Sequence, residues 1–255
     1  MNSKRIRLAL AACAVAAGLA TALDLWLTRD TDTQEAAVLG EVLVSADGQT
    51  ITTAVRWTPC QEVKPRLVAH ESSNSVSLVL HEGTADLRHQ CASTPQQIST
   101  ILRSPLGSRK LTEAGTAWTI TPFHATQLIS PHYLPPGYRQ TDNIYPEDAG
   151  QRPIPSPFER TATQDPVWTR FYSTTSGQPS LSITQISGTN PRGAAPGKQV
   201  SGKDVSISGH SGHLDDKTPD NRTLAWSDGT YTFVINTASP HITDAQLLEI
   251  ASHLN

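Results

Sequence analysis

The sequence predicts a mainly β protein, in which a small disulfide-stapled β domain is followed by an α+β domain with an antiparallel sheet and a C-terminal helix. Three observations lead to this prediction. The chain contains 16 Gly and 18 Pro and only 5% aromatic residues, a composition typical of short strands joined by many turns. Several short runs alternate apolar and polar residues with a period of two, as in strands with one buried face. A single well-marked helix signal stands at the C-terminus.

The first 27 residues have the pattern of an export segment. Three basic residues, Lys4, Arg5 and Arg7, precede an almost continuous apolar run from Leu8 to Leu27, and a polar stretch begins at Thr28. Positive charge stays on the cytoplasmic side of a membrane, so the chain that follows is translocated. We therefore expect the rest of the protein to be extracytoplasmic.

Three interpretations of this segment stay open. An anchor in the plasma membrane would use residues 8–27, close to the ~20 residues that span a bilayer, and this is the interpretation we favour. A cleaved signal peptide would end at Ala22, after the small residues Ala20 and Thr21. A lipoprotein would be lipidated at Cys13, although the apolar run before it is short for a signal sequence.

Cys13 lies in the leader, so the exported part of the chain contains two cysteines, Cys60 and Cys91. In an oxidising compartment, two cysteines most simply form one disulfide. Closing a loop of that length stabilises a fold by roughly 3–4 kcal/mol in the chain-entropy model. A zinc or redox pair is the alternative, but no C-x-x-C motif supports it.

The first domain is predicted over residues 38–122 as a small β-sandwich or barrel. Asp47-Gly48 separates two β-rich runs, which is a strong hairpin signal. In the run from Ser75 to His81, Val76, Leu78 and Leu80 are spaced for one buried face. The predicted strands are 42–46, 50–55, 66–70, 75–81, 98–102 and 118–120.

The second domain is predicted over residues 130–255. It opens with Leu134-Pro-Pro-Gly-Tyr138, and a Pro-rich stretch over 139–166 follows, which is either a mobile linker or a functional loop. The predicted strands are 167–172, 180–186, 204–208, 223–226 and 231–235, the last two joined by a hairpin at Asp228-Gly229.

The chain ends in the predicted helix. Thr243 as N-cap and Gln246 three residues later match a capping box, and Ile242 and Leu247 are spaced for a hydrophobic staple. One apolar face follows, so the helix is expected to pack on the sheet. The residues of that face are Leu247, Leu248, Ala251 and Leu254.

Several motifs of the second domain resemble a known group of proteins. Leu134-Pro-Pro-Gly-Tyr138, Leu224-Ala-Trp226, the run 229–234 and the run 247–252 are similar to uncharacterised extracytoplasmic bacterial domains, which are related to lipoprotein-carrier proteins and to periplasmic regulators of anti-sigma factors. The resemblance covers about residues 130–255. It implies a curved sheet around helices that presents an apolar groove to an acyl chain, although only one helix is predicted here. In the N-terminal half, residues 104–109 resemble a segment of uncharacterised exported actinobacterial proteins, and no activity follows from it.

The aromatic and aliphatic residues of the second sheet are the candidate ligand groove. They can equally form an ordinary core, and the resemblance is what favours a groove. The candidate residues are Trp168, Phe171, Leu181, Ile183, Trp226, Tyr231 and Phe233.

The sequence gives less support for a metal site or a catalytic site than for a ligand groove. In Gly209-His-Ser-Gly-His213, two histidines suggest zinc, but on a regular strand His210 and His213 point to opposite faces. Ser211 lacks the second glycine of a nucleophile elbow. We therefore expect no metal ion, no cofactor and no catalytic residues.

These observations together predict a non-catalytic extracytoplasmic binding or sensor module, with a lipid or another apolar molecule as the expected ligand. The alternative is an envelope protein that contacts other proteins and holds no small ligand. The formal net charge is −3, and basic residues form no stripe after the leader, so nucleic acid is not an expected partner.

Overall fold

The computed structural model describes residues 33–36, 38, 41–57, 63–83, 94–141, 165–174, 179–188, 202–218 and 221–254. Within them the protein is mainly β with one C-terminal α-helix, as predicted. The export segment, both cysteines of the predicted disulfide and most of the Pro-rich stretch lie outside the described residues. Within the described residues, no helix has the length and apolar character needed to cross a membrane.

The first of three sheets is built around β5 (Ser75–Gly83). β4 (Arg66–Glu71) pairs antiparallel with one edge of β5. The other edge is shared, because β7 (Lys110–Glu113) runs parallel to its beginning and β1 (Thr33–Ala36) runs antiparallel to its end.

The second sheet has the order β6-β3-β2-β8. β2 (Val42–Val44) and β3 (Thr50–Trp57) form the hairpin predicted at Asp47-Gly48, with Gly48 at a positive φ of 75°. β6 (Thr94–Ile101) pairs antiparallel with β3, and the two-residue β8 (Phe123–His124) pairs parallel with β2.

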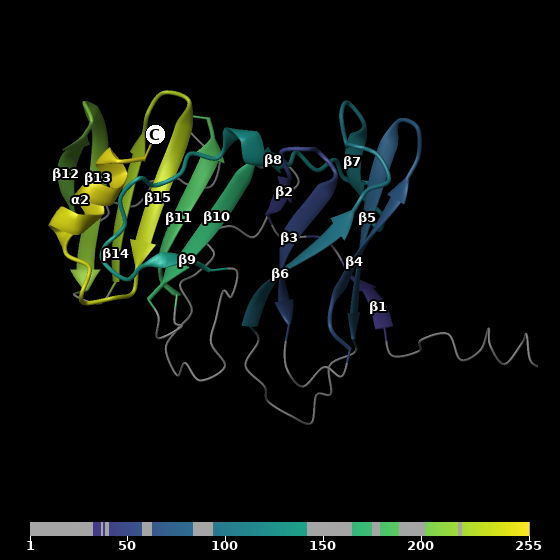
Figure 1. Ribbon diagram of the computed structural model, residues 1–255, viewed down its shortest axis with the longest axis horizontal. Helices are drawn as coiled ribbons and strands as arrows, with labels where there is room; N and C mark the ends of the chain where they lie inside the picture. Colours follow the sequence, from purple (N-terminus) through teal and green to yellow (C-terminus); the bar gives the residue numbers. More distant parts are fainter. Residues whose placement is uncertain are drawn as a thin grey trace, which may run out of the picture.

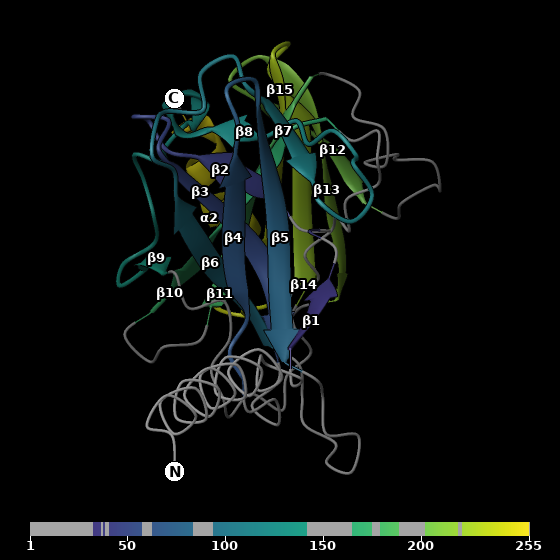
Figure 2. The same ribbon diagram turned by 90° about the vertical axis from the view of Figure 1, so that its right-hand side faces the viewer.

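These two sheets pack face to face as a β-sandwich, one of the two architectures predicted for this part of the chain. In Figure 2 the sandwich faces the viewer, and β4 and β5 lie in front of β3 and β6. Alternate side chains of both sheets meet in one buried cluster, as the period of a strand requires. Its strand residues are Val42, Val44, Ile51, Val55, Leu67, Val76, Leu78, Leu80 and Leu111.

The third sheet is antiparallel throughout and has the order β12-β13-β14-β15-β11-β10-β9. Its strands are β9 (Arg139–Thr141), β10 (Val167–Ser173), β11 (Pro179–Ser187), β12 (Lys203–Ile207), β13 (His210–Thr218), β14 (Asn221–Ser227) and β15 (Tyr231–Thr237). β9 pairs only with Phe171–Ser173, so the outer edge of β10 before Phe171 has no strand partner among the described residues.

Helix α2 (Asp244–Ser252) covers one face of the third sheet (Figure 1). The predicted capping box is present: Gln246 N donates to Thr243 Oγ1 at 3.3 Å and Thr243 N donates to Gln246 Oε1 at 2.9 Å. Ile242 and Leu247, the predicted staple, are both buried in the cluster beneath the helix. Ile250 is fully buried as well, so it joins the packed face.

The sandwich meets the third sheet where β2 and β8 approach β10 and β15 (Figure 1). The Phe123 ring of β8 lies 6.1 Å from the Tyr231 ring of β15. The Glu41 carboxylate, just before β2, accepts hydrogen bonds from Thr169 N at 2.5 Å and from Thr169 Oγ1 at 2.6 Å. Thr169 is thus the residue of β10 that Glu41 holds at the unpaired edge.

Most predicted strands are present, with three differences. The strand predicted at 118–120 is present only as an isolated bridge: after the turn at 114–116, Thr119 pairs with Thr112, and the backbone of 118 and 120 forms hydrogen bonds with that of 113 and 111. The strands β1, β7, β8 and β13 were not predicted. The predicted loop 139–166 begins with the strand β9. The predicted domain limits stay a prediction.

Candidate ligand pocket

A pocket of about 350 Å³ lies between the sandwich and the third sheet. One wall is the outward face of the second sheet. There Leu43, Thr52 and Gln97 come from the adjacent strands β2, β3 and β6. Val42 and Val44 are buried in the sandwich core, so the alternation of the strand turns Leu43 outward.

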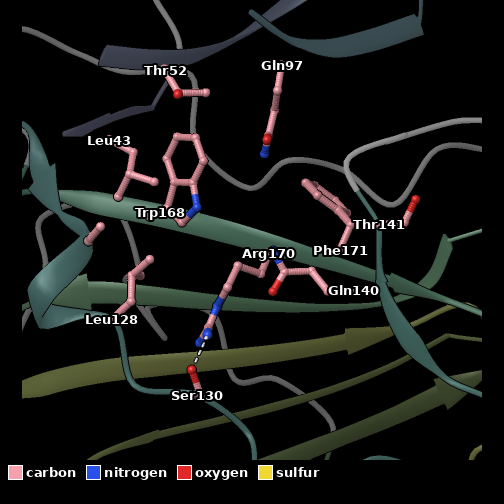
Figure 3. Close-up of a pocket in the computed structure, with 11 residues that line it drawn as sticks. Leu43, Thr52, Gln97, Leu128, Ser130, Gln140, Thr141, Trp168, Arg170 and Phe171 are labelled. Carbon is pink, nitrogen blue, oxygen red and sulfur yellow. Dashed lines mark hydrogen bonds between the residues drawn. The ribbon is translucent and has the colours of Figure 1, made fainter. Parts of the chain in front are cut away.

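The opposite wall belongs to β10, β9 and the segment that crosses from the sandwich. Figure 3 shows Trp168 pointing toward Leu43 and Thr52, while Arg170 points toward Ser130. Trp168 is only 4% exposed. The residues of this wall are Ala125, Leu128, Ser130, Gln140, Thr141, Trp168, Arg170 and Phe171.

Arg170 is the charged residue of the pocket. Its side chain donates through Nη2 to the Ile129 carbonyl oxygen and through Nη1 to Ser130 Oγ at 3.5 Å, while Nε has no partner among the residues that the structure describes. Burial lowers the pKa of its guanidinium, and the nearby Tyr172 phenol opposes that shift. Burial also raises the pKa of Tyr172, whose hydroxyl has no hydrogen-bond partner in the described part of the chain.

Glu41 is a second buried ionisable group close to this wall, through its contact with Thr169 between Trp168 and Arg170. Desolvation by burial raises the pKa of Glu41 to about 7, although the two hydrogen bonds from Thr169 work in the opposite direction. Thr169 Oγ1 also lies 2.9 Å from Thr184 Oγ1 on β11. A hydrogen-bond chain therefore runs from the carboxylate into the third sheet.

The sequence-predicted groove residues separate into two groups. Trp168 and Phe171 line the pocket. Trp226 and Phe233 stack with ring centroids 5.0 Å apart, and Tyr231 lies edge-on to Phe233 at 6.2 Å. These three residues, with Leu181 and Ile183, belong to the cluster that packs beneath α2.

Sequence reasoning did not identify the rest of the pocket. Arg170 carried a signal, because it is the only charged residue in the strand predicted at 167–172. Leu43, Thr52 and Gln97 carried none, because their place in the pocket depends on how two sheets meet.

The glycine- and histidine-rich segment forms a hairpin. Ser208 and Gly209, both at positive φ, turn β12 into β13, the backbone expected of a two-residue hairpin loop. A Cβ on Gly212 would lie 2.9 Å from Ile207 Cδ1 and 3.1 Å from the carbonyl oxygen of Ala225, so the hairpin is tightly packed at this glycine. His210 is exposed, and His213 Nδ1 lies 3.3 Å from Asp204 Oδ1. In the part of the chain that the structure describes, no three His, Cys, Asp or Glu residues gather as metal ligands.

Comparisons with known proteins add no relative. No protein-family model, no curated protein and no solved structure matches the chain.

Proposed function

We propose that the protein is a non-catalytic binding module of the extracytoplasmic space, and that its ligand occupies the pocket between the sandwich and the third sheet. The observation that carries this proposal is the pocket itself, in which a largely buried tryptophan and arginine stand beside outward-facing residues of another sheet. Small-molecule sites combine apolar walls with a few converging polar groups, and volumes of roughly 300–1,000 Å³ are usual for them.

The size and lining of the pocket limit the kinds of ligand that fit it. Its volume is at the lower end of that range, and six of its eleven lining residues are polar. This favours a small molecule with an apolar portion, which rests on Trp168 and Phe171, over a complete lipid with long acyl chains.

The test is native mass spectrometry of the full chain, expressed for export and purified without chelator. We expect an added small-molecule mass on the wild-type protein. Gln97→Trp places an indole in the pocket and should remove this mass. Ile101→Trp is the matched control, because Ile101 is 78% exposed on the same face of β6 and is not part of the pocket; it should leave the added mass in place.

A bare polypeptide for the wild-type protein would overturn the proposal in favour of an envelope protein that binds other proteins. An added mass that survives Gln97→Trp would place the ligand elsewhere on the molecule.

The export and disulfide predictions belong to the same proposal. The pattern of residues 1–27 supports delivery across the plasma membrane, and the cysteine usage supports one disulfide between Cys60 and Cys91. The same spectrum reads both, since a disulfide lowers the polypeptide mass by two hydrogens and leader cleavage after Ala22 removes residues 1–22. The kinship with lipoprotein-carrier and anti-sigma-factor-regulator domains stays a proposal that rests on the short motifs of residues 130–255.

A further inference from the structure

Arg170 is the feature of the pocket that a purely apolar ligand leaves unexplained. It is only 5% exposed, on a strand whose residues are all buried. A guanidinium group has five N–H donors. Here one N–H group donates to the Ile129 carbonyl, another reaches Ser130 Oγ at the outer limit of a hydrogen bond, and the Nε group has no acceptor within the described ranges.

Two other largely buried arginines among the described residues have acidic partners. Arg109 Nη1 lies 2.8 Å from Glu71 Oε2, and Arg222 Nε lies 3.2 Å from Asp244 Oδ1. Their side chains are 12% and 16% exposed. Among the described residues, no carboxylate forms an ion pair with Arg170. A buried charge without a counter-charge is costly, and binding of an anion removes that cost.

We propose that the ligand of this pocket is a small organic anion, whose charged group is bound by Arg170 and whose apolar body lies against Trp168 and Phe171. Arginine suits this role because its planar fork matches carboxylate and phosphate oxygens, and it stays protonated even when buried. The Ser130 hydroxyl and the Gln97 and Gln140 amides line the same pocket and supply further hydrogen-bonding groups. This inference rests on the proposed function, since it names the chemical class of the same ligand.

Isothermal titration calorimetry with matched probes tests the charge. The probes are 1-naphthylacetate, its neutral isostere 1-naphthylacetamide, and 1-naphthyl phosphate, each titrated into the full exported chain. We expect both anions to bind at least tenfold more tightly than the amide. The tighter of the two anions identifies a carboxylate or a phosphate as the preferred group.

Variants then assign the effect to Arg170. Arg170→Met keeps a side chain of similar length without charge and should lower anion affinity at least tenfold, while affinity for the amide changes less than twofold. Arg170→Lys keeps a positive charge and should recover part of the anion affinity. Arg109→Met is the control, because Arg109 is an arginine that does not line the pocket, and its replacement should leave all three affinities unchanged.

The possible failures are distinct. If the anions and the amide bind equally and Arg170→Met changes neither, the pocket binds ligands but the inference is wrong, and Arg170 serves only to hold residues 129–130 on the sheet. If no probe binds, the inference is wrong, and the mass spectra decide the proposed function separately: an added mass that is lost in Gln97→Trp still places a ligand in the pocket. Circular dichroism of Arg170→Met confirms that a loss of binding is not a loss of fold; if this variant unfolds, Arg170→Lys decides by the same comparison of anion and amide.

Discussion

Thr169 alone, among the described residues, donates hydrogen bonds to the carboxylate of Glu41. Its backbone N–H and its hydroxyl reach the two oxygens of that carboxylate, at 2.5 and 2.6 Å. Both residues are almost fully buried. The contact joins the chain just before β2 to the edge of β10, so the protonation of one carboxyl group is tied to the way the two parts of the molecule meet.

Stability should fall as the pH rises toward neutrality because of Glu41. Burial raises its pKa from 4.5 to about 7 in the folded protein, so the folded state holds a proton that the unfolded chain has already released. The stabilisation is fully present below about pH 4.5 and is lost as the pH passes about 7, a total of about 3 kcal/mol at about 1.4 kcal/mol per pKa unit. Urea unfolding at pH 5, 6, 7 and 8 measures it. Glu41→Gln, which cannot titrate, should remove this part of the pH dependence and be the more stable protein at pH 8; an unchanged pH profile would contradict the assignment.

Loss of the Thr169 hydroxyl should be most harmful when Glu41 is ionised. Thr169→Val keeps the backbone N–H bond but removes the side-chain donor to the carboxylate. We expect a loss of about 2 kcal/mol at pH 8, in the range for hydrogen bonds to charged groups. The loss should be smaller in a Glu41→Gln background. Thr169→Ser retains the hydroxyl and serves as the control; equal losses in both backgrounds would show that the two residues are not coupled.

Phe123 should be among the most sensitive positions of the sandwich. It is fully buried in β8 and contacts the Tyr231 ring of the third sheet. Phe123→Ala removes a large buried side chain, so we expect a loss of about 3–5 kcal/mol in chemical unfolding. Ile101→Ala, at a position 78% exposed, should change stability by less than about 0.5 kcal/mol. Comparable losses in the two variants would argue against a packed junction at Phe123.

The capping box should contribute to the stability of α2. Thr243→Ala removes the acceptor for Gln246 N, and we expect a loss of about 1 kcal/mol. Thr243→Ser keeps that acceptor and should be close to wild type. Hydrogen exchange of the amides in the first turn of α2 is a local readout. Unchanged protection there in Thr243→Ala would mean that packing on the sheet alone holds the start of the helix.

Features set by neighbouring residues were predictable from the sequence. The Asp47-Gly48 hairpin and the Thr243 cap each depend on residues within a few positions of one another, and both are present. The parallel pairs of β7 with β5 and of β8 with β2 were not predicted. These strands are short, and their partners are distant in sequence, so no local periodicity predicts them. The strand predicted at 118–120 is reduced to the single bridge at Thr119, where two backbone hydrogen bonds join the segment to β7.

The pocket was predictable only in part. Trp168 and Phe171 attracted attention because they are aromatic, whereas the same reasoning also selected Trp226 and Phe233, which pack beneath α2. A sequence pattern separates buried from exposed faces, but it does not tell which buried face borders a cavity. The other wall, with Leu43 and Gln97, exists because the sandwich lies against the edge of β10.

That edge has a further consequence for the behaviour of the protein in solution. The N–H of Thr169 points away from the sheet at a position where no described strand pairs with β10. An open strand edge of this kind is a template on which another molecule can add a strand and begin to aggregate. Glu41 occupies the position with a side chain instead of a strand, and a carboxylate has no N–H through which the sheet could continue. The residue that joins the two parts of the chain therefore also blocks the addition of a strand from another molecule at this stretch of the β10 edge.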